Sequence, residues 1–329
     1  GFTYDLKDDY LKLGYSKEEA AEFDSLLTIS AICSAVEKAG HTIERIGNVD
    51  VLYQKLLGDN SAIINERWDF VFNICEGLRG SGRESLVPAL LDSYQIPYTF
   101  SDPLTHAITL NKAVTKRLLK SEGIATTDFV LISSLTELDS MNLSYPCFVK
   151  PVSEGTGKGI TPKSKVHNKA ELAAQVTERL KQFKQPVLVE PFLTGREVTV
   201  GVLGTGANAF CLGVMNVGFT DKADSDIHSY YNKENCEFAA VYTPAKDEFA
   251  AKCADLALRA HRLLDIKDAC RVDIRADEHG EPQIMEINSL PGLMPGRSDL
   301  ILLAEMFDYS YQQVIEAIIK SAVERQLTT

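Results

Sequence analysis

The amino-acid sequence predicts an α/β protein in which sheets and helices form layers. Segments with strand-like and helix-like patterns alternate along the chain, which is typical of such folds. A chain of 329 residues is long enough for two or three domains with properly buried cores. Its content of 45% apolar and 24% charged residues is ordinary for a soluble globular enzyme.

The first third of the chain is expected to form an open-sheet α/β domain that ends near Asp102. A capping-box pattern at Ser16 and Glu19 indicates the start of a long helix, which Gly40 would end. The expected elements are a strand over residues 2–6, a helix over 16–39, strands over 42–46 and 70–74, and a helix over 85–94.

Two further regions are expected after this domain. The second has helices over 105–110, 112–122 and 169–183, with strands over 147–150, 187–190 and 197–203. The third has a strand over 210–217, a polar loop over 220–237, and helices over 247–264 and 309–325. The expected boundaries are 1–104 for the N-terminal domain, 105–196 for the central region and 197–329 for the C-terminal region.

The most informative stretch is a predicted β-hairpin in the third region. A two-residue loop at 279–280 would suit the glycine-bearing turns that match strand twist. Its register places Asp273 opposite Glu286 and Arg271 opposite Asn288, in pairs whose Cα atoms lie about 4.5 Å apart. These polar side chains would share one face of the hairpin. The opposite face would be apolar and would consist of Val272, Ile274, Met285 and Ile287.

The polar face of this hairpin is a candidate magnesium site. Two carboxylates directly opposite each other repel unless a cation lies between them. Asp273, Glu286 and Asn288 offer oxygen atoms, the hard ligands that suit Mg²⁺, which usually also keeps waters and shares its shell with phosphates. A surface hairpin with solvated acidic groups remains the alternative.

A glycine-rich loop over 153–159 is a candidate phosphate-binding segment. It reads Ser-Glu-Gly-Thr-Gly-Lys-Gly and follows Lys150 at the end of a strand. Glycines let backbone N–H groups approach phosphates, and lysines neutralise phosphate charge. The loop lacks the Walker A spacing, and an ordinary flexible loop is an equally good interpretation of the pattern alone.

The end of the strand over 187–190 is a candidate nucleoside-binding segment. Glu190, Phe192 and Leu193 close this strand, and Glu197 follows. Exposed backbone groups, an aromatic ring and carboxylates could hold an adenine and a ribose. Taken alone, the segment is better interpreted as a buried edge strand with two surface glutamates.

Composition narrows the class of protein. A formal net charge of −12 opposes nonspecific attraction to nucleic acid or to an anionic membrane. Seven cysteines without a Cys-x-x-Cys pair indicate reduced thiols in the cytoplasm. No run approaches the roughly 18 apolar residues of a membrane span, and no signal peptide opens the chain. His106, His228 and His261 lack zinc-ligand spacing and are interpreted as structural or solvated.

Taken in order, the motifs resemble the D-alanine:D-alanine ligase branch of the ATP-grasp superfamily. The resemblance extends from about residue 70 to the end and more loosely over the N-terminal domain. It rests on Leu110-Asn-Lys112, Val149-Lys150-Pro151, the Glu154-Gly-Thr-Gly loop, Glu190-Pro-Phe-Leu193, Glu197, Arg271-Val-Asp273 and Glu286-Ile-Asn288-Ser-Leu-Pro-Gly292. It implies an ATP-grasp fold, α+β in its ATP-binding part, that binds ATP between two domains. It also implies small amino-acid substrates, two Mg²⁺ ions with Mn²⁺ possible, and a possible homodimer.

The resemblance also implies roles for individual residues. The loop over 153–159 would close over the phosphates, and Arg271 with the Gly292 N–H would stabilise the tetrahedral oxyanion. Tyr231 would keep the role of a tyrosine in the family. The implied binding residues are Lys112, Lys150, Glu154, Gly155, Thr156 and Gly157 for phosphates, Glu190, Phe192 and Leu193 for adenine, Glu197 for ribose, and Asp273, Glu286 and Asn288 for metal.

Departures from the family pattern cluster where substrate identity is set. Glu76 stands where the family has a histidine, and a carboxylate there could bind a substrate ammonium. Arg83 follows nearby, and the family's N-terminal glutamate is only loosely echoed by Glu22. Arg297 and Ser298 follow the Pro-Gly motif where the family binds the second substrate's carboxylate, which Arg297 could clamp bidentately. The charged residues among these substrate candidates also suit a solvated surface.

The expected function is an ATP- and Mg²⁺-dependent ligase that joins two small amino acids through an acyl phosphate. Synthesis of D-alanyl-D-alanine is the first candidate reaction. A related ligase that forms another dipeptide or amide stays open. So does an ATP-binding protein without ligase activity, although a pure binder needs neither Arg271 nor the complete metal set.

Overall fold

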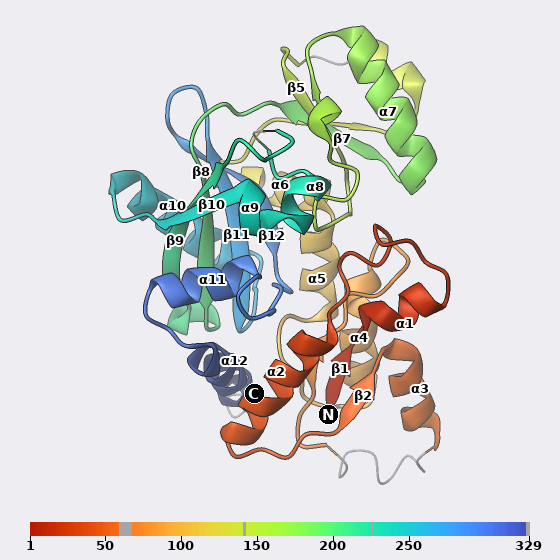
Figure 1. The fold of residues 1–329 in the computed structure, drawn as a ribbon, viewed down its shortest axis with the longest axis vertical. Helices are drawn as coiled ribbons and strands as arrows, with labels where there is room; N and C mark the ends of the chain where they lie inside the picture. Colours follow the sequence, from red (N-terminus) through yellow and green to blue (C-terminus); the bar gives the residue numbers. More distant parts are fainter. Residues whose placement is uncertain (59–67, 141–142, 226, 327–329) are drawn as a thin grey trace.

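The computed structural model describes residues 1–58, 68–140, 143–225 and 227–326. Three sheets follow one another along the chain, as Figure 1 shows. Each predicted region contains one of these sheets. The predicted boundaries at 104 and 196 themselves stay a prediction.

The N-terminal sheet has three parallel strands in the order β2-β1-β3. These strands are β1 (Phe2–Tyr4), β2 (Arg45–Gly47) and β3 (Phe72–Ile74), and the helices are α1 (Lys7–Lys12), α2 (Leu26–Lys38), α3 (Val49–Gly58) and α4 (Leu86–Ser93). Phe2 and Phe72 from the sheet share a core with Ile29 and Ile32 from α2. This arrangement is the open-sheet α/β domain that the sequence predicts.

The central sheet has four antiparallel strands in the order β4-β7-β5-β6. Its elements are β4 (Val130–Ile132), β5 (Cys147–Pro151), β6 (Lys165–Val166), α7 (Lys169–Phe183) and β7 (Val187–Pro191). Asn168 caps α7 by accepting a hydrogen bond from Glu171 N at 3.0 Å. Leu172 and Val176 of α7 share a core with Val149 of the sheet, which fixes the helix on one face.

The C-terminal sheet has five antiparallel strands in the order β10-β9-β8-β11-β12. Its strands are β8 (Glu197–Leu203), β9 (Phe210–Phe219), β10 (Ala240–Pro244), β11 (Ala269–Ala276) and β12 (Pro282–Asn288). The helices of this part and its approach are α5 (Pro103–Leu110), α6 (Lys112–Ser121), α8 (Tyr230–Glu234), α9 (Cys236–Ala239), α10 (Glu248–Leu263), α11 (Asp299–Met306) and α12 (Tyr311–Gln326). Apolar residues of α10 pack with Val198 and Val200, whereas those of α11 pack with Leu203 and Leu212.

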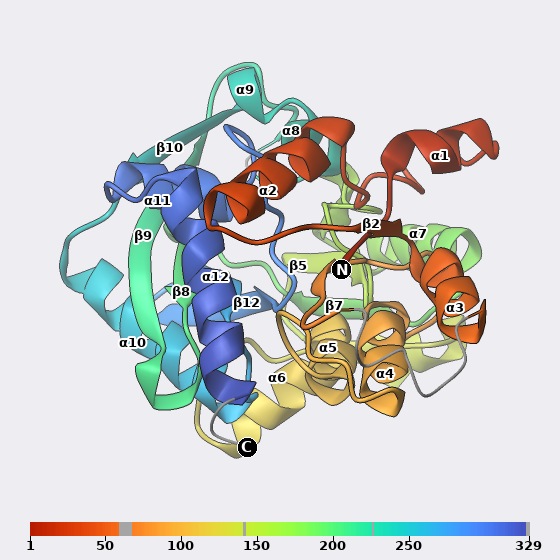
Figure 2. The ribbon, with the colours of Figure 1, turned by 90° about the horizontal axis from the view of Figure 1, so that it is seen from below.

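The N-terminal and C-terminal sheets are joined by one continuous core. Ile29 of α2 belongs to the same buried cluster as Ile301 of α11 and Ile315 of α12. Gln312 Nε2 also donates to Ala35 O at 2.9 Å. Figure 2 shows α2 and α12 side by side. This shared core therefore fixes the N-terminal and C-terminal sheets relative to each other.

The predicted helix over 16–39 is wrong in its first half. The capping box itself is present, because Ser16 N donates to Glu19 Oε2 at 2.8 Å and Glu19 N donates to Ser16 Oγ at 3.2 Å. It closes a short turn, and α2 begins only after Ser25. Asp24 pairs its backbone with Asp5 and Lys7, and this extended pairing interrupts the helix.

The predicted hairpin is correct at the polar face and wrong at the loop. Asp273 pairs with Glu286 and Arg271 pairs with Asn288. The loop, however, has three residues, since Asp277 N donates to Glu281 O and Gly280 has a φ of +82°. A bulge between Asp273 and Ile274 compensates for the longer loop. The bulge turns Met285 out of the apolar face, and Ile284 takes its place among Val272, Ile274 and Ile287 in the core.

The structure adds two observations to the compositional expectations. Among the described helices, none combines the length and apolarity that crossing a membrane requires. All seven cysteines are unpaired. A cytoplasmic location and a homodimer stay predictions.

Candidate active site

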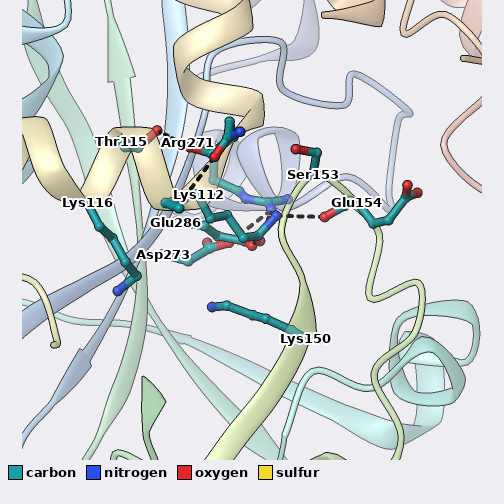
Figure 3. A network of polar contacts seen from close by, with 12 residues as sticks. Lys112, Thr115, Lys116, Lys150, Ser153, Glu154, Arg271, Asp273 and Glu286 are labelled. Carbon is teal, nitrogen blue, oxygen red and sulfur yellow. Dashed lines mark hydrogen bonds and ion pairs between the residues drawn. The ribbon is translucent and has the colours of Figure 1, made fainter. Parts of the chain in front are cut away.

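The polar face of β11 and β12 lies at the centre of the site (Figure 3). The carboxylate of Asp273 accepts hydrogen bonds from Thr199 Oγ1 and from Arg271, each at 2.9 Å. Arg271 is held further by Asp299 at 2.9 Å. The hairpin register and the neighbouring strand β8 thus position this arginine and the predicted metal ligands together.

Cations surround the carboxylate of Glu286. Lys112 Nζ lies 3.4 Å from Glu286 Oε2, and Arg271 lies 3.7 Å from Oε1. Lys112 also donates to the backbone oxygen of Glu154 at 2.6 Å (Figure 3). Burial alone would raise the pKa of the Glu286 carboxyl, but Lys112 and Lys233 hold it well below its usual range. Glu286, a candidate metal ligand, is therefore anionic at neutral pH.

Asp273, Glu286 and Asn288 form a donor set that fits a hard divalent cation. The buried Nδ2 of Asn288 has no hydrogen-bond partner in the described part of the chain. The amide can therefore turn its oxygen toward a metal without losing a bond to that nitrogen. Within residues 1–58, 68–140, 143–225 and 227–326, no group of three or more His, Cys, Asp or Glu side chains could hold a metal. In the candidate site the amide would be the third protein ligand, and phosphate and water would complete the shell.

A cavity of about 80 Å³ lies between the central and C-terminal sheets, where the predicted adenine and ribose residues meet. Its lining includes Phe148, Lys150, Glu190, Phe192, Leu193, Glu197, Asp273, Arg275, Met285 and Glu286. The backbone N of Phe192 donates to Pro146 O at 2.9 Å, and Lys165 Nζ lies 4.0 Å from the Phe192 ring centroid. Glu197 pairs with Arg275 at 3.3 Å. Phe192 thus forms an apolar wall of this cavity, and the pair of Glu197 with Arg275 forms a charged wall.

Glu190 is the anchor of a buried lysine pair. Its carboxylate lies 2.6 Å from Lys150 Nζ and 2.9 Å from Lys116 Nζ. Burial alone would raise the pKa of Glu190, but the two lysines lower it to about 2. The carboxylate thus aims the phosphate-binding candidate Lys150. Lys116 was missed by sequence reasoning, although its spacing of four residues from Lys112 places both on one helix face.

The glycine-rich loop packs against the N-terminal domain. Gly155 N donates to Glu22 Oε1 at 2.7 Å, and Lys158 Nζ lies 2.6 Å from Glu22 Oε2. Gly157 has a φ of +70°, and a Cβ on it would lie 3.0 Å from the backbone N of Tyr230. The loop is thereby held over the junction of all three parts of the molecule. Glu22, which only loosely matches the family's N-terminal glutamate, thus lies at the site.

A larger cavity of about 360 Å³ lies beside the metal face. Its lining includes Glu22, Asp24, Glu76 and Glu84 from the N-terminal domain, and Arg271, Asn288, Gly292, Arg297 and Ser298 from the C-terminal part. Glu154, His228, Lys233 and Glu286 line both this cavity and the smaller one. The two cavities therefore meet at the predicted metal ligand Glu286.

Two of the predicted substrate residues play supporting parts in this geometry. Arg83 is 5% exposed and donates to Ser153 O at 2.7 Å while pairing with Glu22 at 3.0 Å, so it joins the N-terminal domain to the loop. Arg297 lines the larger cavity and donates to Glu234 O at 3.0 Å.

Gly292 and Ser298 lie in direct contact at the rim of the larger cavity. Ser298 Oγ accepts a hydrogen bond from Met294 N at 2.9 Å. A Cβ on Gly292 would lie 2.8 Å from the same oxygen. A larger residue at position 292 would therefore displace the Ser298 side chain. The chain turn that brings both residues to the cavity is therefore held by the Ser298 side chain.

Tyr231 is not brought to the site, and neighbouring residues are. Tyr231 is 45% exposed and lies outside both cavities, whereas Lys233 lines both. Asp24, Glu84 and Tyr242 also line the larger cavity and were not proposed from the sequence. The predicted polar loop over 220–237 contains residue 226, which lies outside the described residues. Its remaining part includes α8 and α9.

A family model described as "D-ala D-ala ligase C-terminus" matches residues 118–320, more than half of the chain. The chain belongs to the D-alanine–D-alanine ligase family. A D-alanine–D-alanine ligase of Aquifex aeolicus is 31% identical over 90% of this chain and 94% of its own length. An uncharacterized protein, y4sG of Sinorhizobium fredii, is 32% identical over 78% of this chain and 75% of its own.

The fold of the family is also found in solved structures. The VanG D-Ala:D-Ser ligase of Enterococcus faecalis has a TM-score of 0.73 and 20% sequence identity, over 98% of each chain. Family membership confirms the predicted ATP-grasp fold and the predicted ligase class. Members of this family use ATP and a divalent metal, which agrees with the two joined cavities and the oxygen donor set described above.

Proposed function

We propose that this chain is an ATP- and Mg²⁺-dependent ligase that joins two small amino acids through an acyl phosphate. The observation that carries the proposal is the meeting of two cavities at Glu286, with Lys112 and Arg271 beside it. A nucleotide in the smaller cavity would direct its phosphates toward substrates in the larger one. Two reactants held in line in this way react without paying the entropy of a random encounter.

The first step would transfer the γ-phosphoryl group to the donor amino acid. A donor carboxylate oxygen attacks phosphorus, the bond from phosphorus to the β-γ bridging oxygen breaks, and ADP leaves. Lys112 and Lys150 neutralise charge on the phosphates. Asp273, Glu286 and Asn288 would hold two Mg²⁺ ions, or Mn²⁺, which neutralise phosphate charge and orient the transferred group when bound.

The second step would form the amide bond. The acceptor nitrogen attacks the carbonyl carbon of the acyl phosphate, loses its proton, and the carbon–oxygen bond to phosphate then breaks. After the nitrogen attacks and before phosphate leaves, the carbonyl oxygen carries negative charge. Arg271 and the Gly292 N–H would stabilise that charge, and the contacts of the Arg271 guanidinium with Asp273 and Asp299 support this role.

The two amino acids are the finer part of the proposal. D-alanine with D-alanine is the first candidate pair, because the Aquifex relative carries that activity in its name. A ligase for a different pair is the second candidate. It is favoured by the carboxylates Asp24, Glu76 and Glu84, which make one end of the larger cavity acidic.

The test is ADP release with ATP and Mg²⁺ across D- and L-amino acids, singly and in pairs, with mass spectrometry of the products. A dipeptide formed in step with ADP is the expected result. Glu286→Gln should abolish that turnover, and the exposed Glu281→Gln should not. Near-normal turnover of the Glu286 variant would contradict the metal assignment. ATP binding without turnover for any pair would instead favour a nucleotide-binding protein without ligase activity.

A further inference from the structure

Four carboxylates of the N-terminal domain line one end of the larger cavity, and one of them is already neutralised. Glu22 accepts the Gly155 N–H at 2.7 Å and pairs with Arg83 at 3.0 Å and Lys158 at 2.6 Å. A carboxylate with two cationic partners and a backbone donor has little capacity left for a substrate ammonium.

The other three carboxylates, Asp24, Glu76 and Glu84, have no Lys or Arg nitrogen within 4.0 Å in the described part of the chain. Glu84 is 9% exposed, accepts no hydrogen bond from a described residue, and approaches His106 at 3.9 Å. Burial lowers the pKa of His106 to about 4, so this imidazole carries no charge near pH 7. Glu84 is thus a buried carboxyl group without a Lys or Arg partner in direct contact among the described residues.

Burying these groups without a cation costs free energy that a ligand can recover. Desolvation raises the pKa of Asp24 and of Glu84 to about 7, and it raises that of Glu76 well above its usual range. The empty site therefore favours protonated carboxyls, whereas a bound cation restores the charged forms. An arrangement of this kind is suited to a positively charged ligand.

The acidic end adjoins the place where the carboxylate is activated. Glu84 contacts His106, whose Nδ1 lies 2.9 Å from Ser289 Oγ, and Ser289 follows the metal-ligand candidate Asn288. Arg297, the candidate for binding the second substrate's carboxylate, instead forms an ion pair with Glu234, with 3.7 Å between the guanidinium nitrogen and Oε1. The link from Glu84 through His106 and Ser289 therefore leads to the metal-ligand candidate Asn288, beside which the donor carboxylate would be activated.

We propose that the donor substrate is a basic amino acid whose side-chain ammonium or guanidinium is bound by Asp24, Glu76 and Glu84. The inference rests on the proposed function. The α-ammonium supplies one positive charge, and three uncompensated carboxylates accommodate a second. The cavity of about 360 Å³ falls among pockets of about 300–1,000 Å³ that hold ligands larger than alanine.

The experiment compares cationic amino acids with neutral ones of matched length. Lysine with norleucine, ornithine with norvaline, and arginine with citrulline are assayed in both enantiomers, each with ATP, Mg²⁺ and D-alanine. ADP release gives kcat/KM, and mass spectrometry identifies the dipeptide. We expect kcat/KM to be roughly 10- to 100-fold higher for the cationic member of at least one pair, because hydrogen bonds between charged groups are strong.

Isotope labelling identifies which substrate is the donor. Only the donor carboxylate passes an oxygen atom to phosphate, so ¹⁸O from the labelled basic amino acid should appear in the released phosphate. Retention of both ¹⁸O atoms in the dipeptide would place the basic amino acid at the acceptor position and overturn the inference.

Substitutions connect the preference to the carboxylates. Glu76→Gln and Glu84→Gln should each lower the ratio of kcat/KM for the basic amino acid to kcat/KM for its neutral partner. Turnover of the neutral partner shows that each variant is folded, and Glu281→Gln is the control with an exposed carboxylate. A preference that survives in both variants would overturn the assignment.

The outcomes separate this inference from the proposed function. Turnover of neutral amino acids without preference for cationic ones would leave the ligase function standing and refute the basic donor. Absence of turnover with any pair, the cationic ones included, would refute both.

Discussion

Two arginines on β11, four residues apart, serve different cavities. Arg271 lines the larger cavity and is held by Asp273 and Asp299, whereas Arg275 lines the smaller one and pairs with Glu197. Residues four apart on a strand point to the same face, so both cavities open on one side of the sheet. The same strand therefore supplies one cation to each cavity.

Arg271→Ala should reduce kcat about 100- to 1,000-fold with little effect on the KM of ATP, since an oxyanion donor acts in the transition state. Arg275→Ala should show the opposite pattern, a raised KM of ATP with kcat changed much less. Steady-state kinetics of both variants with the same amino-acid pair would reveal this separation. Equal losses in kcat and ATP affinity for the Arg271 variant would refute the oxyanion role.

Glu84 should make the stability of the ligand-free protein depend on pH. Burial raises its pKa to about 7, against about 4.3 in an unfolded chain. Between these values the folded state holds a proton that the unfolded state has released. Stability should therefore fall as pH rises from about 4.5 to 7, and level off above. Glu84→Gln removes this loss, about 3–4 kcal/mol for a pKa shift of this size, at pH 8 but not at pH 4.5.

Thermal unfolding of the two proteins across that range would measure the effect. Glu281→Gln is the control, since the carboxylate of Glu281 is exposed in the hairpin loop. A Glu84 variant whose gain in Tm is the same at pH 4.5 and pH 8 would show that the carboxyl is not perturbed in the folded state.

At the scale of elements, the glycine-rich loop depends on a close backbone approach. Gly157 has a φ of +70°, and a Cβ would lie 3.0 Å from Tyr230 N and 3.1 Å from His228 O, neither of which is a flexible side chain. Gly157→Ala should therefore displace the loop and raise the KM of ATP by about tenfold or more, since such strain costs about 1–3 kcal/mol. Gly280 has a similar φ of +82° but open space around it, so Gly280→Ala should leave the KM of ATP unchanged. Unchanged ATP kinetics in both variants would contradict a loop closed over phosphates.

The hairpin shows what the sequence could and could not reveal about the site. The register of a two-residue loop at 279–280 placed Asp273 opposite Glu286, and the structure has this pair. The three-residue loop and the bulge at Met285 have opposite effects on register, so the polar face was predicted correctly despite a wrong loop. Bulges depend on tertiary packing, here the contribution of Met285 to the smaller cavity, and local sequence does not encode that.

Nonlocal contacts account for the other errors. The capping box at Ser16 is real, but pairing of Asp24 with Asp5 stops the helix that local pattern favours. Glu84 was not proposed from the sequence because charged residues are usually exposed, and its burial follows from packing of the 3₁₀ turn Arg83–Ser85 against α5. Motifs along single strands were therefore more predictable than the cavity that residues from distant parts of the chain line.

At the scale of the whole molecule, the site depends on how firmly the outer domains are joined. The buried carboxylate of Asp268 accepts hydrogen bonds from Arg325 at 2.9 Å, Ser321 Oγ at 2.9 Å and the backbone N of Phe100 at 2.7 Å. These donors come from α12 and from the segment that leads out of the N-terminal domain. Asp268 thus connects the N-terminal domain, α12 and the start of β11.

Asp268→Asn should lower the free energy of unfolding by about 3 kcal/mol, because it removes a buried charge from its cationic partner and turns an N–H₂ group toward a donor. Asparagine tolerates the φ of +65° at this position, so backbone strain adds little. Urea unfolding followed by circular dichroism measures the loss. Asp265→Asn, in the same turn with an exposed side chain, is the matched control and should change stability by less than about 0.5 kcal/mol.

A loss confined to the folding equilibrium, with kcat unchanged in the folded fraction, would show that Asp268 joins the domains without taking part in the reaction. Equal stability of the two variants would mean that the shared apolar core alone holds the domains together.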